Sequence, residues 1–375
     1  INFSTPVRIL ILGASGSGKS WLARSIISRA YFANILPIIM TDIAPEYITS
    51  IYPLQEKYKK FLIKGEESKT LPMKMFYPYF LYKEVKFESS LQQIFQYNIS
   101  SILPTDLFAF VDYESFGLGG RLELENLIAR MGKGKEKFES IDDLLNFVNR
   151  REDISTLTKR LLLKSLANLK ISGVFGNDYP PLDIINLINN NVVVDINLFG
   201  WQRLEFKKYV AVYLSLILRD IITAKQLKKI GNKKLVLLFE ELHEFAPKKP
   251  TKWQEVIKRE IETAVFTGRK EDISFIFITQ SPETISPSVI EQCNYIFIPR
   301  GFERSKVMQI VKEIAPSQYS TPYNFGIEIT NLMGSLKQWK DGAREWLVLE
   351  RGRGIFKIVP FAPLNHHKEE GEVIE

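Results

Sequence analysis

Short runs of apolar residues alternate with helical patterns along much of the chain. Each run has the length of a strand, and few polar residues interrupt it, which is typical of strands that are covered on both faces of a parallel sheet. The strand candidates are residues 7–12, 35–42, 191–199, 235–239, 273–280 and 294–299. The alternation of strand and helix predicts an α/β fold with a mainly parallel central sheet flanked by helices.

Between residues 48 and 189 the alternation is interrupted. This stretch begins with irregular, aromatic-rich sequence and continues with an amphipathic helical pattern rich in leucine. Near the C-terminus, EWLVLERGRGIFKIVPF predicts a β-hairpin around Gly352 and Gly354. We therefore expect three parts, which are a core of residues 1–47 and 190–365, an inserted and mostly helical subdomain of residues 48–189, and a solvated tail of residues 366–375.

The composition fits a folded intracellular protein with an anionic partner. Hydrophobic residues make up 45% of the chain and charged residues 25%, which excludes a disordered chain, and the net charge of +7 favours a polyanionic partner. A single cysteine, Cys293, excludes an internal disulfide, and no apolar run is long enough for a bilayer span. We expect a cytoplasmic protein. The chain opens at Ile1 and not at a methionine. The alternative is therefore a membrane anchor in a preceding segment, which would place the protein at the cytoplasmic face of a membrane.

The segment GASGSGKS follows the first predicted strand and opens a helix. It matches the pattern G-x-x-x-x-G-K-[S/T] of loops that bind nucleotide phosphates. Successive backbone N–H groups would point at the phosphates, Lys19 would reach the β and γ phosphates, and Ser20 would offer an oxygen to Mg²⁺. The predicted nucleotide-binding residues are Gly13, Ala14, Ser15, Gly16, Ser17, Gly18, Lys19 and Ser20. The predicted ligands are ATP and Mg²⁺.

Two glutamates, Glu240 and Glu241, end the apolar run of residues 235–239. Buried carboxylates are costly without partners, so we expect the pair at the exposed end of a strand beside the P-loop strand. A hydrolytic site needs one carboxylate for Mg²⁺ and one for the attacking water, and we assign Glu240 to the metal and Glu241 to the water. A solvated helix start is the alternative. Thr279 and Gln280 end another strand, and Gln280 is predicted to respond to the γ-phosphate or the water.

Five segments follow one another in an order that is typical of one ATPase superfamily. They are GASGSGKS, TDIAPEY, VVVDINLFG, LLFEELHEFAP and TGRKEDISFIFITQSPETISPSVIEQCNYIFIPR. In this order they resemble the HerA/FtsK superfamily of hexameric DNA-pumping ATPases, and especially its HerA and conjugation-type secretion members. The resemblance implies a RecA-like (ASCE) P-loop fold, ATP hydrolysis, a hexameric ring of identical subunits, and double-stranded DNA as the partner. It does not extend to residues 48–189.

Single positions follow or depart from the pattern of that superfamily. Asp42, Glu46 and Tyr47 match its acidic turn after the second strand. Glu240 stands where aspartate is usual, and Leu242 replaces a small residue. The resemblance implies that Arg269, in a Gly-Arg-Lys motif, is the arginine finger that acts on the nucleotide of the neighbouring subunit. The alternatives for this role are Arg300, Arg304, Arg351 and Arg353.

A lysine-rich loop after the two glutamates is the predicted DNA contact. Lys248, Lys249 and Lys252 occur there with no acidic residue among them, and lysines of this kind bind DNA phosphates without regard to base sequence. Another lysine-rich segment, residues 225–234, precedes its strand. We expect it at the opposite end of the sheet, as a solvated helix end.

These observations favour a ring-forming ATPase that couples ATP hydrolysis to translocation of double-stranded DNA. The process would be genome packaging, conjugation or import through a membrane channel, or end processing with a nuclease partner. The alternatives are a nucleotide-dependent scaffold or switch, or a P-loop kinase that does not act on DNA. A kinase would not need the water-activating Glu241. A guanine-specific GTPase is disfavoured because the chain contains no Asn-Lys-x-Asp motif.

Overall fold

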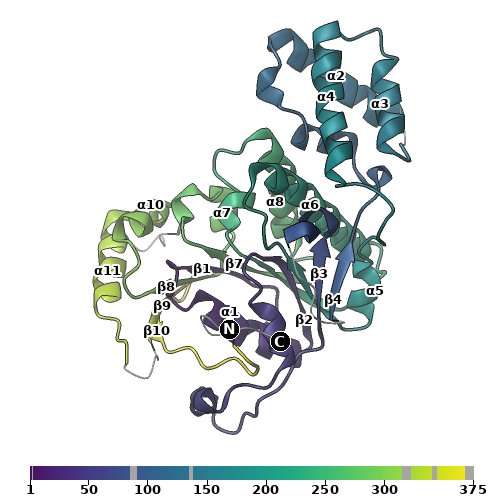
Figure 1. Cartoon of the computed structure of the whole chain (residues 1–375). Coiled ribbons are helices and arrows are strands. Elements are labelled where there is room, and N and C mark those ends of the chain that lie inside the picture. Colours follow the sequence, from purple (N-terminus) through teal and green to yellow (C-terminus); the bar gives the residue numbers. More distant parts are fainter. Residues whose placement is uncertain (2, 85–90, 135–137, 315–321, 340–343, 368–375) are drawn as a thin grey trace.

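The computed structural model describes all residues except 2, 85–90, 135–137, 315–321, 340–343 and 368–375. Its centre is a ten-stranded sheet with the order β10-β9-β8-β1-β7-β6-β2-β5-β3-β4 (Figure 1). The strands are β1 (Arg8–Leu12), β2 (Ile35–Asp42), β3 (Met73–Pro78), β4 (Gln92–Phe95), β5 (Val193–Asn197), β6 (Lys234–Phe239), β7 (Ile273–Thr279), β8 (Tyr295–Pro299), β9 (Trp346–Glu350) and β10 (Gly354–Ile358). Every pair from β8 to β4 is parallel, and β9 runs antiparallel to both neighbours. The predicted α/β fold with a mainly parallel sheet is confirmed.

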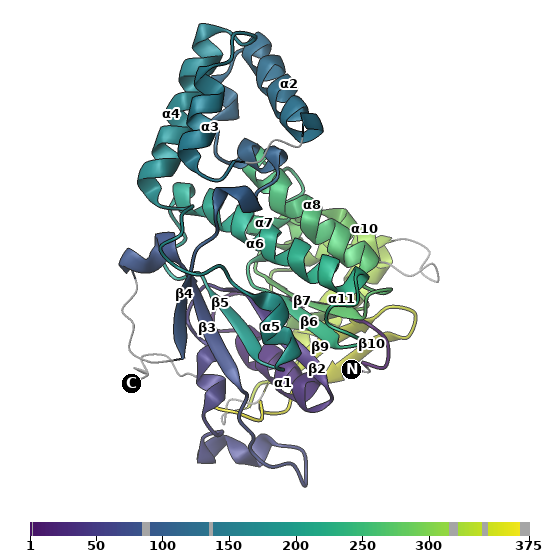
Figure 2. The same ribbon diagram turned by 90° about the vertical axis from the view of Figure 1, so that its right-hand side faces the viewer.

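Helices cover both faces of this sheet (Figures 1 and 2). They are α1 (Lys19–Phe32), α2 (Leu118–Gly134), α3 (Ile141–Asn149), α4 (Thr156–Ser172), α5 (Ile184–Asn189), α6 (Leu204–Gln226), α7 (Leu242–Phe245), α8 (Lys252–Thr267), α9 (Pro287–Ile290), α10 (Arg304–Ile314) and α11 (Pro322–Gly334). Helix α1 leads from β1 to β2 and α6 leads from β5 back to β6, in opposite directions across the sheet. Because such crossovers are right-handed, α1 and α6 lie on opposite faces. Helix α8, which leads from β6 to β7, packs beside α6.

The apolar runs form the core as their pattern predicts. All residues of β1, β2, β5 and β7 are buried, which is the burial expected for strands between two layers of helices. The most apolar stretch of α6, residues 210–218, is also entirely buried. Among the described residues, each helix is too short or too polar to cross a membrane.

Residues 48–189 differ in part from the predicted helical insertion. Helices α2, α3 and α4 project together as a lobe away from the sheet (Figures 1 and 2). However, β3 and β4 extend the central sheet, with Met73 opposite Val193 of β5. The segment also forms 3₁₀ turns, which are η1 (Tyr47–Ile51), η2 (Glu56–Phe61), η3 (Tyr79–Glu84), η4 (Ile99–Ser101), η5 (Pro104–Ala109) and η6 (Tyr113–Ser115). The division into core and inserted subdomain stays a prediction.

A buried arginine attaches this insertion to the core. Arg219 of α6 donates two hydrogen bonds to Asp106 of η5, at 2.7 and 2.6 Å, and Asp106 is fully buried. The same guanidinium lies 3.2 Å from Glu260 of α8. One cation therefore balances two carboxylates where the insertion meets α6 and α8.

The C-terminal part of the chain returns to the sheet and then to α1. The hairpin predicted around Gly352 and Gly354 is confirmed as β9 and β10, with Gly354 opposite Glu350. Beyond it, the ring of His367 packs against Trp21 at 5.2 Å between centroids, so the residues where the tail is predicted to begin lie against the protein. The rest of the predicted tail, residues 368–375, lies outside the described residues.

Candidate nucleotide-binding and hydrolysis site

The P-loop, the two glutamates and Gln280 meet at the carboxyl ends of neighbouring parallel strands, where α/β sheets bind their ligands. The P-loop (residues 13–20) follows β1, Gln280 follows β7, and Glu240 follows β6. The expectation that the glutamate-bearing strand lies next to the P-loop strand is wrong, because β7 lies between them. Two strand spacings separate β1 from β6, about 10 Å. The intervening strand places Gln280 between the P-loop and the two glutamates.

Glycines give the P-loop its path. A Cβ atom at Gly13 would lie only 2.2 Å from Ser17 Oγ, and Gly18 has φ +92°, a left-handed conformation that favours glycine. Helix α1 begins directly after Gly18, so its N-terminal N–H groups and partial positive charge face the loop. Ser17 Oγ is buried and has no hydrogen-bond partner among the described residues. This buried hydroxyl and the helix N-terminus fit a bound phosphate group.

Lys19 lies within this loop. Its Nζ donates a hydrogen bond to Ala14 O at 2.9 Å. Burial lowers the pKa of Lys19, and the negative charges of Glu241, Glu240 and Glu46 partly oppose this change. The lysine and the two predicted glutamates therefore act on one another electrostatically. Ser20 lies beside Lys19 in the first turn of α1 and is half-buried.

Glu241 is held in a strained conformation by polar neighbours. It has φ 45° and ψ 47°, which is costly for a residue other than glycine and is typical of functional sites. Gln280 Nε2 donates to Glu241 Oε1 at 2.8 Å, and His243 Nδ1 lies 3.2 Å from Oε2. Burial favours a higher pKa for Glu241, but the contacts with His243 and Gln280 and the charge of Lys19 outweigh it, so the pKa is lowered. An ionised carboxylate in this position can accept a proton from water.

Glu240 points into a buried acidic cluster beneath the site. The hydroxyl of Tyr47 donates to Glu240 Oε1 at 2.8 Å, and Thr41 Oγ1 bonds the backbone N–H of Glu240 at 2.5 Å. Burial raises the pKa of Glu240, and the nearby charges of Asp42 and Glu46 raise it further. The tyrosine hydroxyl therefore holds one of the two carboxylate oxygens of Glu240.

This arrangement fits a metal that takes only one or two protein ligands. Among the described residues, no group of three or more acidic, histidine or cysteine side chains could hold a metal. Mg²⁺ at phosphate sites usually keeps several waters and binds one or two protein oxygens besides the phosphates. Ser20, which follows Lys19 in α1, and Glu240, whose charge acts on Lys19, would supply those oxygens.

Arg269 lies at the far edge of the sheet from its own P-loop. It is exposed in the turn between α8 and β7, whereas the site lies beyond the other end of β7. Seven residues of strand separate the two ends, about 20 Å. Arg351 and Arg353, in the turn of the β9–β10 hairpin, also lie at this far edge, whereas Arg300 follows β8 at the site edge. Arg269 is therefore too far from its own P-loop to contact a nucleotide bound there.

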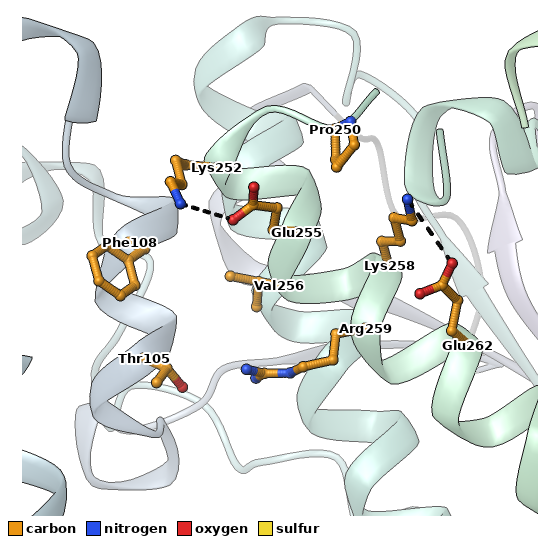
Figure 3. A pocket seen from close by; sticks show the side chains of 9 residues that line it. All are labelled: Thr105, Phe108, Pro250, Lys252, Glu255, Val256, Lys258, Arg259 and Glu262. Carbon is orange, nitrogen blue, oxygen red and sulfur yellow. Dashed lines mark hydrogen bonds and ion pairs between the residues drawn. The ribbon is translucent and has the colours of Figure 1, made fainter. Parts of the chain in front are cut away.

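The three lysines predicted to bind DNA have different surroundings. Lys248 and Lys249 are exposed between α7 and α8. Lys252, in contrast, lies beside a pocket of about 380 Å³ between η5 and α8 (Figure 3). Its Nζ is 4.9 Å from the centre of the Tyr113 ring and 3.2 Å from Glu255 Oε2. The ammonium group of Lys252 thus contacts the insertion. Of the three lysines, Lys248 and Lys249 are the two that are exposed.

Three side chains at the site are missing from the sequence-based set of site residues. His243 contacts Glu241, Tyr47 holds Glu240, and Arg344 Nη1 donates to Gly16 O of the P-loop at 2.8 Å. Tyr47 and His243 stand in motifs that match the superfamily, but no role could be read from their positions. Arg344 precedes the predicted C-terminal hairpin and carries no motif.

Comparisons with known proteins identify a matching family and similar solved structures. The family described as "Helicase HerA, central domain" matches residues 7–217, which includes the insertion. Among solved structures, the bacterial conjugative coupling protein TrwBdeltaN70 is 13% identical, with a TM-score of 0.53, covering 96% of this chain and 88% of that one. The genome packaging NTPase B204 from Sulfolobus turreted icosahedral virus 2, in complex with ATP-gammaS, is 14% identical, with a TM-score of 0.41, covering 96% and 100%.

The comparison with curated proteins gave no match. The structural likeness to TrwBdeltaN70 supports the predicted RecA-like P-loop fold. The family match covers more than half of the chain and confirms the resemblance found in the sequence. The chain therefore belongs to the helicase HerA central-domain family.

Proposed function

We propose that this chain is the subunit of a ring-forming, hexameric ATPase that couples ATP hydrolysis to translocation of double-stranded DNA. The observation that carries the proposal is the setting of Glu241. Its carboxylate is ionised, strained and held by Gln280 at 2.8 Å, and it acts electrostatically on Lys19 of the P-loop. A scaffold or a kinase has no need of such a carboxylate, whereas a hydrolase does.

The residues of the chain would divide the chemistry among them. The P-loop N–H groups and Lys19 would bind the phosphates of ATP, with Lys19 exchanging Ala14 O for phosphate oxygens. Bound Mg²⁺, held by Ser20 and Glu240, would offset the negative charge of the phosphates. Glu241 would orient the attacking water and accept its proton, and Gln280 would connect the position of that water to β7.

Further features support DNA as the partner and a ring as the assembly. The family is described as a helicase, which points to nucleic acid as the cargo. Lys248 and Lys249 are exposed in the loop that follows the site helix α7, and lysines of this kind bind phosphates of any sequence. Arg269 lies too far from its own P-loop to act there and is offered to a neighbour, which requires subunits arranged head to tail. We keep residues 48–189 as an insertion on this motor.

ATPase activity with and without duplex DNA tests the proposal. We expect turnover that rises with DNA and falls by about 100-fold or more in Glu241→Gln, the loss typical of removing a general base. Nucleotide binding should persist in Glu241→Gln and be lost in Lys19→Ala. Glu56→Gln is a matched control, because Glu56 is 85% exposed and pairs with Lys59 in η2, outside the P-loop.

Other outcomes would favour the alternatives. Nucleotide binding with no turnover under any condition would indicate a scaffold or switch. Phosphate transfer to a small acceptor, with no response to DNA, would indicate a kinase. Light scattering with a slowly hydrolysed ATP analogue tests the ring separately, and a monomer under all conditions would contradict it.

A further inference from the structure

The C-terminal hairpin brings an arginine to the P-loop from an unexpected part of the chain. Strand β9 runs antiparallel to β8, with Trp346 opposite Pro299, so β9 begins at the edge where the parallel strands end. The P-loop lies at this same edge, because it follows β1, the other neighbour of β8. One residue, Glu345, separates Arg344 from the start of β9, so Arg344 lies at the site edge of the sheet.

Its side chain lies along the loop. Arg344 Nη1 donates to Gly16 O at 2.8 Å. At Gly18, a Cβ atom would lie 3.7 Å from Arg344 Cδ, 3.9 Å from Arg344 Nε and 3.8 Å from the Trp346 ring. The guanidinium thus spans the glycine-rich turn that is expected to enclose the phosphates.

The chemistry of this placement favours an anionic ligand. A guanidinium carries five N–H donors in a planar fork, and one of them bonds Gly16 O. Among the described residues, Arg344 forms no ion pair with a carboxylate, unlike Arg353 at the other end of the same hairpin, which pairs with Glu350 at 3.2 Å. Its charge is balanced by no described acid and lies next to the phosphate loop. Phosphate oxygens fit this fork because they accept two parallel N–H bonds.

We propose that Arg344 binds the phosphate chain of the nucleotide held in the P-loop of its own subunit. This inference rests on the proposed function, because it requires a nucleotide in that loop. It assigns two arginines to one nucleotide, with Arg344 in cis and Arg269 in trans. It also connects the nucleotide to β9, so the C-terminal hairpin takes part in the site.

The competing role for Arg344 is a brace that only holds the loop through Gly16 O. A neutral donor could replace a brace, whereas a phosphate contact needs the charge. Three substitutions separate the two roles, which are Arg344→Ala, Arg344→Gln and Arg344→Lys. Glutamine keeps an N–H donor on a shorter side chain but has no charge, and lysine keeps both the charge and a donor without the fork.

Affinity for ATPγS, measured by calorimetry with Mg²⁺ on non-assembled subunits, is the test. We expect Arg344→Ala and Arg344→Gln to weaken binding by about tenfold or more, as expected for a lost charge-assisted contact, and Arg344→Lys to fall between them and the wild type. The loss should shrink at high salt. The control Arg353→Ala, whose side chain is 74% exposed, should bind as the wild type does.

Two results would overturn the inference. Wild-type affinity in Arg344→Gln would show that the residue is a brace, and wild-type affinity in Arg344→Ala would show that it contributes nothing. If Arg344→Ala does not fold, as judged by its thermal unfolding, the glutamine and lysine variants still decide. Failure of the wild type to bind any nucleotide would instead reject the proposed function, so the two failures are distinguishable.

Discussion

Glu241 shows how single contacts set the chemistry of a residue. Burial alone would raise the pKa of this carboxyl group, yet the pKa is lowered because His243 lies 3.2 Å from one carboxylate oxygen, Gln280 donates to the other, and Lys19 lies nearby. Without the Gln280 donor, fewer contacts counteract the rise in the pKa of Glu241 that burial causes. The pKa of Glu241 in Gln280→Ala should therefore rise relative to the wild type.

This change should be visible in the pH dependence of ATP hydrolysis. A base must be ionised to work, so activity falls as the pH drops through its pKa. In wild-type protein the acidic limb of the kcat/KM profile should lie below the usual range of glutamate, and in Gln280→Ala it should move to higher pH. The position of the limb is the measurement, whatever the loss in rate. An unchanged limb, the result expected for the exposed control Gln226→Ala, would show that Gln280 does not tune the base.

The residues found from sequence and those missed differ in how their contacts arise. Lys19, Glu241 and Gln280 stand directly at strand or helix ends, so local pattern and motif are sufficient to place them. Arg344 reaches the P-loop only because β9 is antiparallel and lies two strands from β1. Strand order depends on long-range packing, which hydrophobic periodicity does not report. The left-handed Glu241 is likewise a product of the folded environment.

At the scale of elements, the limits of hydrophobic periodicity also explain why the sequence does not predict β3 and β4. The apolar runs of the main parallel strands are continuous and easy to recognise, whereas β3 lies within aromatic-rich sequence and β4 reads QQIF. The hairpin of β9 and β10 was predictable because two apolar runs flank a turn that contains Gly352 and Gly354. No glycine occurs in the sequence between β3 and β4, so the sequence does not mark these two strands.

The attachment of the insertion gives a prediction about stability. Replacing Arg219 with alanine would leave Asp106 and Glu260 without their shared cation, and Asp106 is fully buried. Loss of one partner of a buried ion pair costs about 3–5 kcal/mol. We expect Arg219→Ala to lower the free energy of unfolding by this amount, and amide exchange to increase first in η5.

The control lies on the neighbouring helix. Arg259 also pairs with Glu260, but its side chain is 53% exposed, so Arg259→Ala should cost less than about 1 kcal/mol. The double variant Arg219→Met, Asp106→Leu removes the buried carboxylate of the insertion together with its cation. Its free energy of unfolding should be closer to that of the wild type than that of Arg219→Ala. Equal unfolding free energies for Arg219→Ala and Arg259→Ala would contradict this account of the attachment.

At the scale of the whole molecule, the positions of the two arginines imply an assembly. Arg344 lies at the edge of the sheet that carries the P-loop, and Arg269 lies at the opposite edge. If Arg269 completes a site, each site is built from two subunits, and no single subunit can hydrolyse ATP at full rate. The sequence could suggest this through family resemblance, but the separation of Arg269 from its own P-loop depends on the direction of β7 within the sheet.

A mixing experiment tests whether Arg269 acts on a neighbour. Lys19→Ala subunits cannot bind nucleotide but keep Arg269, and Arg269→Ala subunits bind nucleotide but lack the finger. Each variant alone should be nearly inactive. In rings assembled from equal amounts of both, about a quarter of the interfaces pair an intact P-loop with an intact finger, so activity should reappear.

The outcome separates action in trans from action in cis. A finger that works within its own subunit leaves no functional site in any mixed ring, so the mixture would stay as inactive as its components. Mixing Lys19→Ala with Glu241→Gln is the matched control, because both defects lie on the nucleotide side and no interface is restored. Activity in the first mixture and none in the second would place Arg269 across the subunit interface, and activity in Arg269→Ala alone would transfer the role to Arg300 or Arg304, which follow β8 at the site edge.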